Sequence, residues 1–410
     1  MSKKKQRSPP WSDLTPELLA LVFLCLPRRS DRVLFTAVCR AWRSAVQQCC
    51  LLPSPVPWLV RPDGSATRFP CGSETIHLPD GVRYHNSCGE WLLLSRDDRG
   101  CFLMNPFTKA TMLLPKLFTY TTYPDPSETI HRLSGLLCIN RNYISVLSLV
   151  VCSKRLIAVI VTKVLGGRTG TLALCRPGDR AWSMGTNELS GRLSDIVFFR
   201  GKLYAIDVNN GRQDLLAIEI VDENGKDDPR VSRIERIFIG VPITSQCSYL
   251  VESRGRLLMV RRKINCRHER VYCWGGNSFI LVAGSSKFEV FEADFGRMLW
   301  TKLRSLGDDQ ALFVGRGCSR AVCVSPYDLS RDSIFFVDDY ISSVWKKTTT
   351  SCGVYDMKDK KVYSTLPMVS WMSGDIPATW LFCEESTTNG LQITGKHLQE
   401  PVETDKECGD

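Results

Sequence analysis

The sequence predicts a mainly β protein in which a small N-terminal α-helical unit precedes a large β-rich domain. Two observations predict this fold class. Clear helical periodicity is confined to the first part of the chain, before residue 50. Beyond residue 70, short apolar runs with β-branched and aromatic residues alternate with Gly, Asp, Asn and Pro, which is typical of strands and turns. We therefore expect the large domain to be a β-propeller, with paired β-sandwiches as the alternative.

Length and composition allow such an organisation. The 410 residues are 43% hydrophobic and 23% charged, which is ordinary for a globular protein with at least one large core. From the composition along the chain we expect five segments. They are a disordered basic tail (1–10), a helical unit (11–50), a Pro-rich connector (51–70), a β-rich domain (71–383) and a disordered acidic tail (384–410).

The net charge of +10 is unevenly spread along the chain. Residues 1–50 carry nine basic and three acidic residues, a net +6, whereas residues 384–410 carry seven acidic and two basic residues, a net −5. A basic head can indicate a nucleic-acid partner or nuclear import. No stripe of basic and aromatic residues follows it, so we expect a solvated tail and no nucleic-acid partner. A regulator that binds nucleic acid through this basic head is kept as an alternative.

The 18 cysteines are scattered, and many lie in apolar runs, such as Cys25, Cys152 and Cys323. With no N-x-[ST] sequon either, this pattern indicates free, buried thiols in a reducing compartment, the cytoplasm and/or the nucleus. Without any C-x-x-C pair, we expect no metal site. The apolar runs 18–26 and 144–161 are too short or too interrupted to span a membrane.

The first fifty residues predict two helices. Thr15 is a plausible N-cap, Pro16 suits the first helical position, and Pro27 ends the first helix after Leu26. A second helix is expected from Ser30 or Asp31 to Val46, with its apolar residues on one face.

The first predicted helix is apolar on all sides, and such a helix must be covered on all sides. About 36 residues cannot supply that cover alone, since domains this small usually need a partner. The cover comes either from another chain or from the rest of this one, and the pattern by itself does not decide between them.

The same stretch contains a series of short motifs in a fixed order: Leu14-Thr15-Pro16-Glu17, Leu18-Leu19, Leu26-Pro27, Asp31 and Val38-Cys39-Arg40-Ala41-Trp42-Arg43. In order and spacing they resemble an F-box, the motif that binds the Skp adaptor of SCF-type cullin–RING ubiquitin ligases. The family's proline falls at Thr15, and this chain has its proline one place later, at Pro16. The resemblance implies that the adaptor-binding residues are Leu14, Pro16, Glu17, Leu18, Leu19, Val22, Phe23, Leu26, Pro27, Val38 and Trp42.

In the β-rich region a glycine turn followed by an apolar strand recurs at Gly89, Gly201 and Gly255. These units lie 112 and 54 residues apart, and about 300 residues can hold six blades of the usual length. The predicted strands lie in EWLLLS, CFLMN, DIVFFRGKLYAID, LLAIEIV, SYLVESRGRLLMVRR, KFEVFEAD, ALFVG, AVCVS, SIFFVDD, CGVYDM and KVYSTL.

This region resembles the kelch-like C-terminal domain of plant F-box proteins, known as domain of unknown function 295. The cues are CRPGDRAW, DIVFFRGKLYAID, YLVESRGRLLMV, FEVFEADF and DSIFFVDD. With the F-box, the resemblance covers nearly the whole chain. It implies a propeller that recognises a target protein for ubiquitination, without naming the target.

No phosphate loop, nucleophile elbow or zinc-protease motif occurs. The acid pairs Asp308-Asp309 and Asp338-Asp339 would point to opposite faces of a strand, so we interpret them as turn acids, and likewise Asp356 and Asp359. These absences predict a non-catalytic chain without a cofactor. The resemblance implies that it is an adaptor, which binds a Skp adaptor and, through it, a cullin–RING ligase. The alternative is a β-propeller enzyme with a structural helical cap.

Overall fold

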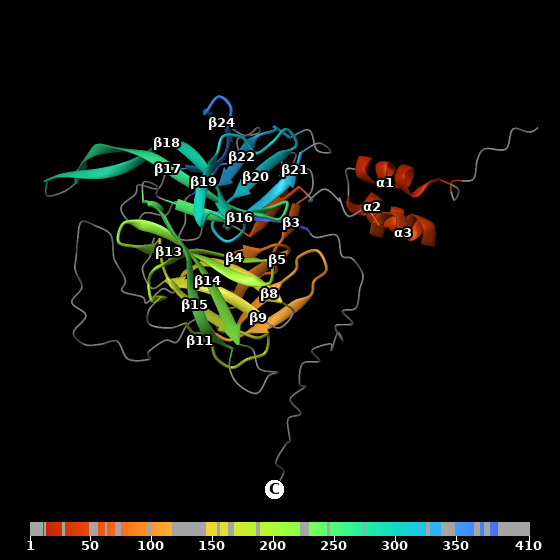
Figure 1. Cartoon of the computed structure of the whole chain (residues 1–410), viewed down its shortest axis with the longest axis horizontal. Coiled ribbons are helices and arrows are strands. Elements are labelled where there is room, and N and C mark those ends of the chain that lie inside the picture. Colours follow the sequence, from red (N-terminus) through yellow and green to blue (C-terminus); the bar gives the residue numbers. More distant parts are fainter. Residues whose placement is uncertain are drawn as a thin grey trace, which may run out of the picture.

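The computed structural model shows a small helical unit standing beside a ring of β-sheets (Figure 1). Both expected tails, 1–10 and 384–410, lie outside the residues that the structure describes. The described residues are 11, 14–26, 29–48, 56–61, 64–69, 75–96, 100–116, 145–153, 156–162, 168–185, 189–221, 229–243, 247–273, 276–324, 329–337, 349–364, 370–372 and 378–383.

The helical unit has three helices, α1 (Pro16–Cys25), α2 (Arg29–Val38) and α3 (Arg40–Gln48). Thr15 is the N-cap of α1 with Pro16 after it, as predicted, although the Thr15 side chain makes no capping bond. The prediction of a single second helix was wrong, because the chain leaves the helix at Cys39 and starts again. The Cys39 thiol accepts a hydrogen bond from the Trp42 amide (3.5 Å), which satisfies a free N–H at the start of α3.

The described strands form six sheets, and the sheets pack around a ring (Figure 1). The first sheet is β26 (Thr379–Leu381), β1 (Trp58–Val60), β2 (Ser65–Arg68) and β3 (Thr75–His77). The second is β4 (Val82–Cys88), β5 (Trp91–Arg96), β6 (Cys101–Met104) and β7 (Thr111–Leu114). The third is β8 (Ser145–Ser153), β9 (Leu156–Thr162), β10 (Thr171–Cys175) and β11 (Ser183–Met184).

The remaining three sheets come from the second half of the chain. The fourth is β12 (Leu193–Phe199), β13 (Lys202–Asn209), β14 (Arg212–Val221) and β15 (Arg230–Pro242). The fifth is β16 (Cys247–Ser253), β17 (Arg256–Cys273), β18 (Gly276–Asp294) and β19 (Leu299–Leu303). The sixth is β20 (Gln310–Val314), β21 (Arg320–Cys323), β22 (Ser333–Val337), β23 (Thr349–Asp356), β24 (Val362–Ser364) and β25 (Ser370–Met372).

The sheets are the blades of a six-bladed propeller, which confirms the propeller prediction over paired sandwiches. One strand of each blade, here called the inner strand, contacts the inner strand of the next blade, in the order β26, β4, β8, β12, β16 and β21. The ring closes between the two ends of the domain, since β26 pairs with β1 in antiparallel register, Leu59 opposite Trp380. Such a closed ring leaves only short sheet edges.

The expected connector at 51–70 needs a correction, because β1 and β2 of the first blade lie within it. A proline in this segment is compatible with these strands when it lies at the end of a strand. Pro62 lies outside the described residues, and Pro57 directly precedes β1. Proline is tolerated at such positions because no ladder hydrogen bond is lost. The propeller therefore begins before residue 71.

The glycine turns that suggested a repeat occupy equivalent places in three blades. Gly89, Gly201 and Gly255 each lie in the two-residue turn that follows an inner strand, and all have positive φ. Glycine suits these turns because it adopts positive φ without a steric penalty. The spacing is irregular because Gly89 belongs to the second blade, whereas Gly201 and Gly255 belong to the fourth and fifth.

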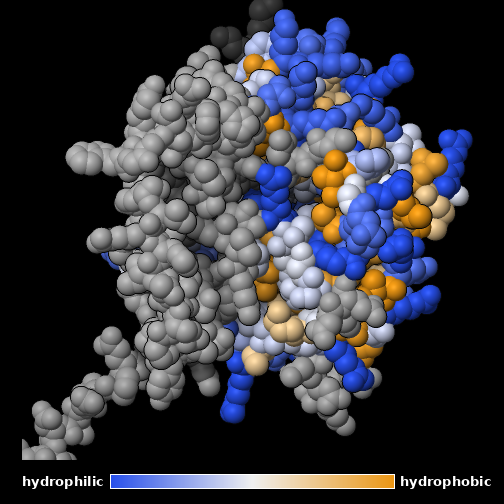
Figure 2. Space-filling view, turned by 90° about the vertical axis from the view of Figure 1, so that its left-hand side faces the viewer, coloured by the Kyte–Doolittle hydropathy of each residue, from blue (hydrophilic) through white to orange (hydrophobic). Residues whose placement is uncertain are grey.

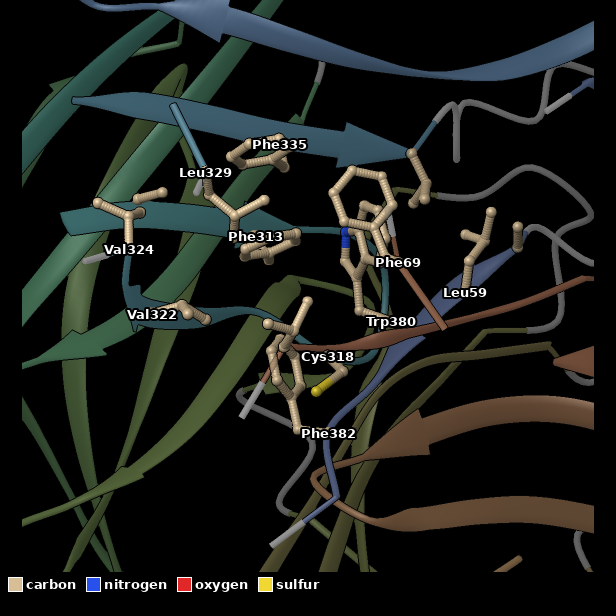
Figure 3. Packing of buried hydrophobic residues seen from close by; sticks show 14 residues of the cluster. Leu59, Phe69, Phe313, Cys318, Val322, Val324, Leu329, Phe335, Trp380 and Phe382 are labelled. Atoms are coloured by element: carbon tan, nitrogen blue, oxygen red, sulfur yellow. The ribbon is translucent and has the colours of Figure 1, made fainter. Parts of the chain in front are cut away.

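The closure is packed by a hydrophobic cluster that joins the first and sixth blades (Figure 3). Trp380 of β26 is fully buried at its centre. Its ring lies 5.3 Å from that of Phe69 and 5.1 Å from that of Phe313, in edge-to-face geometry. The indole N–H donates to the Val314 carbonyl (3.0 Å), so the polar atom of this side chain is also satisfied.

The free thiols fit the expectation of buried cysteines only in part. Cys152 is buried and Cys323 half-buried, while the Cys25 side chain lies outside the described residues. Burial raises the pKa of Cys101 and Cys152 to about 12. These two thiols are therefore protonated and unreactive at neutral pH.

We expect the propeller to lose stability at mildly acidic pH through His85, an inner-strand residue of β4. Burial, helped by the charge of Arg83, lowers the pKa of His85 to about 4 from its usual 6.5. Between these values the unfolded chain binds more protons than the folded one, so stability falls as pH falls. Urea unfolding measures the free energy of unfolding at pH 7.5 and at pH 5. The decrease between these two pH values should be about 1–2 kcal/mol larger in wild type than in His85→Gln. Equal pH dependence in the two proteins would contradict this role.

Within the described part of the chain, no helix has the length and apolar character needed to cross a membrane.

Candidate docking surfaces of the helical unit and the propeller

The helical unit has a hydrophobic core of its own. Leu19 and Phe23 of α1 are each only 1% exposed, and they pack with buried Phe35 and Ala45 from the other two helices. The Phe35 ring lies 5.4 Å from Phe23 and 4.3 Å from Trp42, so each helix supplies at least one member of the cluster. This core fixes the mutual arrangement of the three helices without any residue from the propeller.

The same helices turn other large apolar side chains outward. Leu18 and Val22 are 48% and 40% exposed on α1, and Leu34 and Val38 are 66% and 57% exposed on α2. Each pair has i, i+4 spacing, so its two members lie on one helix face. We call them the exposed apolar pairs. Large apolar side chains that are exposed next to one another are typical of protein-binding sites.

The structure divides the predicted adaptor-binding residues into three groups. Leu18, Val22, Pro16 and Val38 are exposed. Leu19 and Phe23 lie inside the core of the free helical unit, with Leu14, Leu26 and Trp42 partly buried against it. Pro27 and the Glu17 side chain lie outside the described residues.

Two exposed apolar residues were missed by the prediction, Leu34 and Trp11. Leu34 was assigned to the packed face of a single long second helix, and the break at Cys39 changes which face is covered. Trp11 accepts a hydrogen bond from the Trp42 indole at its carbonyl oxygen (3.2 Å), which fixes the start of the unit while the Trp11 side chain stays 71% exposed.

In the propeller, hydrogen bonds that involve a side chain of an inner strand cross every junction between blades. Three inner strands carry a β-bulge or irregularity near their start, and Asn86, Ser148 and Asp195 follow it in β4, β8 and β12. The bonds are Ser87 Oγ to Trp380 O (2.8 Å), Asn86 Nδ2 to Val146 O (3.0 Å), Ser148 Oγ to Asp195 Oδ1 (2.7 Å), Leu250 N to Asp195 Oδ2 (2.7 Å), Ser253 Oγ to Gln310 Oε1 (2.8 Å) and Trp380 Nε1 to Val314 O (3.0 Å).

The inner strands surround a cavity of about 780 Å³, here called the channel cavity. Its wall is mixed, with the apolar residues Leu149 and Ile196 beside charged Asp195, Glu252 and the ion-paired Arg254. A cavity of this volume, ringed by rigid strands, is a common place for ligands and peptide segments.

The fifth blade extends into a long hairpin that projects from the ring (Figure 1). The β17–β18 pairing runs out to Cys273 opposite Gly276. Pairing with the neighbouring strands stops much earlier, at Arg262 on β17 and Val290 on β18. Among the described strands, the outer part of this hairpin therefore has two open edges, and such edges can pair with an extended segment of another protein.

The described outer surface of the propeller is chemically mixed on the face shown in Figure 2, where hydrophobic residues are interspersed with hydrophilic ones. Turn acids account for several conspicuous carboxylates. Asp356 Oδ1 accepts hydrogen bonds from the amides of Lys358 (2.7 Å) and Asp359 (3.1 Å), which confirms the predicted hairpin role of Asp356. Asp309 forms an ion pair with Arg254, and Asp338-Asp339 lie outside the described residues.

Within the described ranges, no group of three or more His, Cys, Asp or Glu residues is placed to hold a metal ion. That search does not reach Cys266, His268 and Cys273 of the projecting hairpin, whose side chains lie outside the described set.

Comparison with known proteins adds two family matches. Residues 65–356 match the model described as KIB1-4 beta-propeller, and residues 11–54 match the F-box domain model.

Similar proteins come from Arabidopsis thaliana. F-box protein SKIP23 is 26% identical over 86% of this chain and 90% of its own length. Putative F-box protein At5g55150 is 24% identical over 88% of this chain and 94% of its own length. F-box/kelch-repeat protein At1g57790 is 33% identical over 28% of this chain and 34% of its own length.

Proposed function

Because the chain belongs to the KIB1-4 β-propeller family and has an F-box domain ahead of the propeller, we propose that it is the substrate-recognition adaptor of an SCF-type cullin–RING ubiquitin ligase. The F-box helices bind the Skp adaptor, and the propeller binds a target protein for ubiquitination. The chain performs no chemistry itself. It holds the target close to the ubiquitin-loaded subunit, which raises their effective concentration.

The observation that carries this proposal is the division of apolar residues within the F-box helices. Their internal core is complete, yet Leu18, Val22, Leu34 and Val38 remain exposed on two helices. Figure 1 places these helices beside the propeller, so they do not form part of its core. A partner chain that covers the exposed apolar pairs explains why a surface helix is apolar on several sides.

The rigid ring of the propeller supports a proposal for where the target binds. Turn and loop residues such as Gly89 and Gly317 line the channel cavity, and the projecting β17–β18 hairpin has open edges among the described strands. Binding residues commonly lie on such loops because the scaffold positions them. We propose that the target binds there. We place the complex in the cytoplasm and/or the nucleus, where SCF ligases act.

A substrate-trapping experiment tests the whole proposal. Leu18→Asp/Val22→Asp puts two charges on the adaptor-binding surface and leaves the propeller unchanged, so this variant should capture targets that it cannot deliver. We expect wild type to co-purify with Skp and cullin subunits from plant cells, and the variant to lose both. Proteins bound by both forms should be more abundant in cells that express the variant, as measured by quantitative proteomics.

The matched control is Met298→Asp/Leu299→Asp, at the end of the β18–β19 turn and the first residue of β19. These residues are 52% and 42% exposed, close to the values for Leu18 and Val22, so the added charge and the apolar area lost are similar. The control should still bind Skp and cullin subunits. Absence of a cullin from the wild-type complex would remove the basis of the proposal.

A further inference from the structure

Two exposed side chains line the channel cavity from neighbouring inner strands. Phe198 lies one residue before the end of β12, and Glu252 lies one residue before the end of β16. Phe198 is 36% exposed, and Glu252 is exposed as well. We call these two residues the strand-end site. They lie at the end of the cavity where both inner strands lead into their turns.

Two hydrogen bonds show that the ends of these strands lie side by side. The Asp195 carboxylate, near the start of β12, accepts from the Leu250 amide of β16 (2.7 Å). The Arg200 guanidinium, just after β12, donates to the Gly255 carbonyl in the turn after β16 (2.6 Å). Both bonds join residues 55 positions apart, so the two strands run in the same direction and in step. Glu252 therefore lies within one residue of the level of the aromatic ring.

Neither side chain of the strand-end site has a partner among the described residues. Within that part of the chain, Glu252 forms no hydrogen bond or ion pair through its carboxylate, and the Phe198 ring contacts no other ring and no cation. A phenyl ring and a carboxylate that are exposed next to each other are complementary to a cation with an apolar stem. The ring attracts the cation through its π face, and the carboxylate accepts a charge-assisted hydrogen bond.

The cations in the turns after these two strands are already engaged. Arg254, after β16, lines the cavity and forms an ion pair with Asp309. The Arg200 guanidinium, after β12, lies 4.9 Å from the centre of the Phe199 ring, and this arginine is not among the described residues that line the cavity. The Glu252 carboxylate is therefore the unpaired charge at this end of the described lining.

Arg320 lines the cavity farther from the site. It begins β21, the inner strand of the sixth blade, and Cys323 ends that strand. Cys323 pairs with Gln310, which accepts a hydrogen bond from Ser253 at the end of β16. The start of β21 thus lies about 10 Å along the strand from the level of the strand-end site. A ligand at this site meets the Glu252 carboxylate and not Arg320.

We propose that the strand-end site binds a basic side chain, lysine or arginine, from a segment of the target protein. The cationic head lies between the Phe198 ring and the Glu252 carboxylate. The stem lies along Val150, Val151 and Val197, which are half-buried in the cavity wall. A free amine would leave most of the cavity of about 780 Å³ empty, whereas a peptide segment with its flanking residues fills it. That this partner is a ubiquitination target rests on the proposed function, and the binding itself does not.

Selection from a random peptide library against the immobilised full chain tests the proposal. We expect the peptides selected by wild type to share a lysine or arginine at one position. The same selection against Glu252→Gln should lose this preference. Selection of no peptide, or of acidic or apolar peptides without a shared basic position, would overturn the proposal. The same proteins are titrated with a Skp adaptor, which should bind all of them equally, so loss of peptide binding and loss of ligase assembly are measured separately.

Affinities of one selected peptide, measured by fluorescence anisotropy, locate its binding site. Glu252→Gln should weaken binding by about tenfold or more, and exchange of the peptide's basic residue for norleucine should add little to that loss. Phe198→Leu keeps apolar area but removes the ring, and it should weaken binding about three- to tenfold.

The control is Glu235→Gln on β15, the outermost strand of the fourth blade, which should bind the peptide as wild type does. Phe198 and Glu252 are exposed, so their variants should keep the wild-type melting temperature. Unchanged affinity in either Glu252→Gln or Phe198→Leu would overturn the assignment.

Discussion

Replacing Trp380 with alanine is expected to lower the free energy of unfolding by about 3–5 kcal/mol. Trp380 is fully buried, and its ring packs against Phe69 and Phe313 across the junction where the propeller closes. The change leaves a large cavity and also removes the partner of the Val314 carbonyl. Urea unfolding of the two proteins, followed by tryptophan fluorescence and circular dichroism, measures the difference.

The position of the loss matters as much as its size. Trp300→Ala is a suitable control, since Trp300 is also buried but lies on β19 and packs against Phe238, away from the closure. In Trp380→Ala, hydrogen exchange should accelerate first in β1 and β26, the paired strands that close the ring. In Trp300→Ala these strands should keep their protection. A loss below about 1 kcal/mol in Trp380→Ala would contradict the assigned role of this side chain.

The double substitution Leu18→Asp/Val22→Asp is expected to weaken binding of a Skp adaptor by more than about 100-fold. Burial of a leucine or valine contributes about 1.5–3 kcal/mol. Replacing both by carboxylates removes that contribution and requires two charges to be desolvated in the complex. A factor of 100 corresponds to about 2.7 kcal/mol, so the expected loss follows from either effect. Calorimetric titration of the purified proteins measures it.

A buried neighbour on the same helix separates docking from folding. Leu19→Asp places a charge in the core of the helical unit, since Leu19 is almost completely covered. That variant should lose helical structure and adaptor binding together, whereas Leu18→Asp/Val22→Asp should lose only binding. Retention of wild-type affinity by the exposed-pair variant would show that another face of the helices contacts the adaptor.

The sequence predicted local structure best at positions where one residue type is favoured for one physical reason. Gly89, Gly201 and Gly255 predicted turns, and the structure places all three after inner strands, because positive φ there favours glycine. The apolar runs predicted strands correctly for the same kind of reason. The alternation of apolar runs with turn residues is a local property of the sequence. It predicts where strands lie whichever strands they pair with.

Features that depend on tertiary packing could not be predicted. Asn86, Ser148 and Asp195 link the inner strands of different blades, yet each belongs to a different sequence pattern and none follows a motif. The bulges that place them arise from pairing with the adjacent strand, which no local signal reveals. The strands β1 and β2 were likewise hidden, because the prolines around them suggested a connector.

The helical unit shows the same limit. An all-round apolar first helix predicted that more cover is needed than one small core supplies, and Leu18 and Val22 of this helix are exposed. Which side chains face inward depends on the crossing of three helices, and the prediction assumed two. Leu19 and Phe23 consequently prove to be core residues of the free unit, while Leu34 proves to be exposed. Whether the adaptor contacts follow this division stays a prediction.

The most direct test of the central claim is a titration of the wild-type chain with a purified Skp adaptor, followed by size-exclusion chromatography with light scattering. We predict a saturable one-to-one complex, in which hydrogen exchange slows in α1 and α2 and stays unchanged in the propeller. A folded, monomeric chain that forms no complex with the adaptor would contradict the claim, and the F-box helices would then have a structural role only.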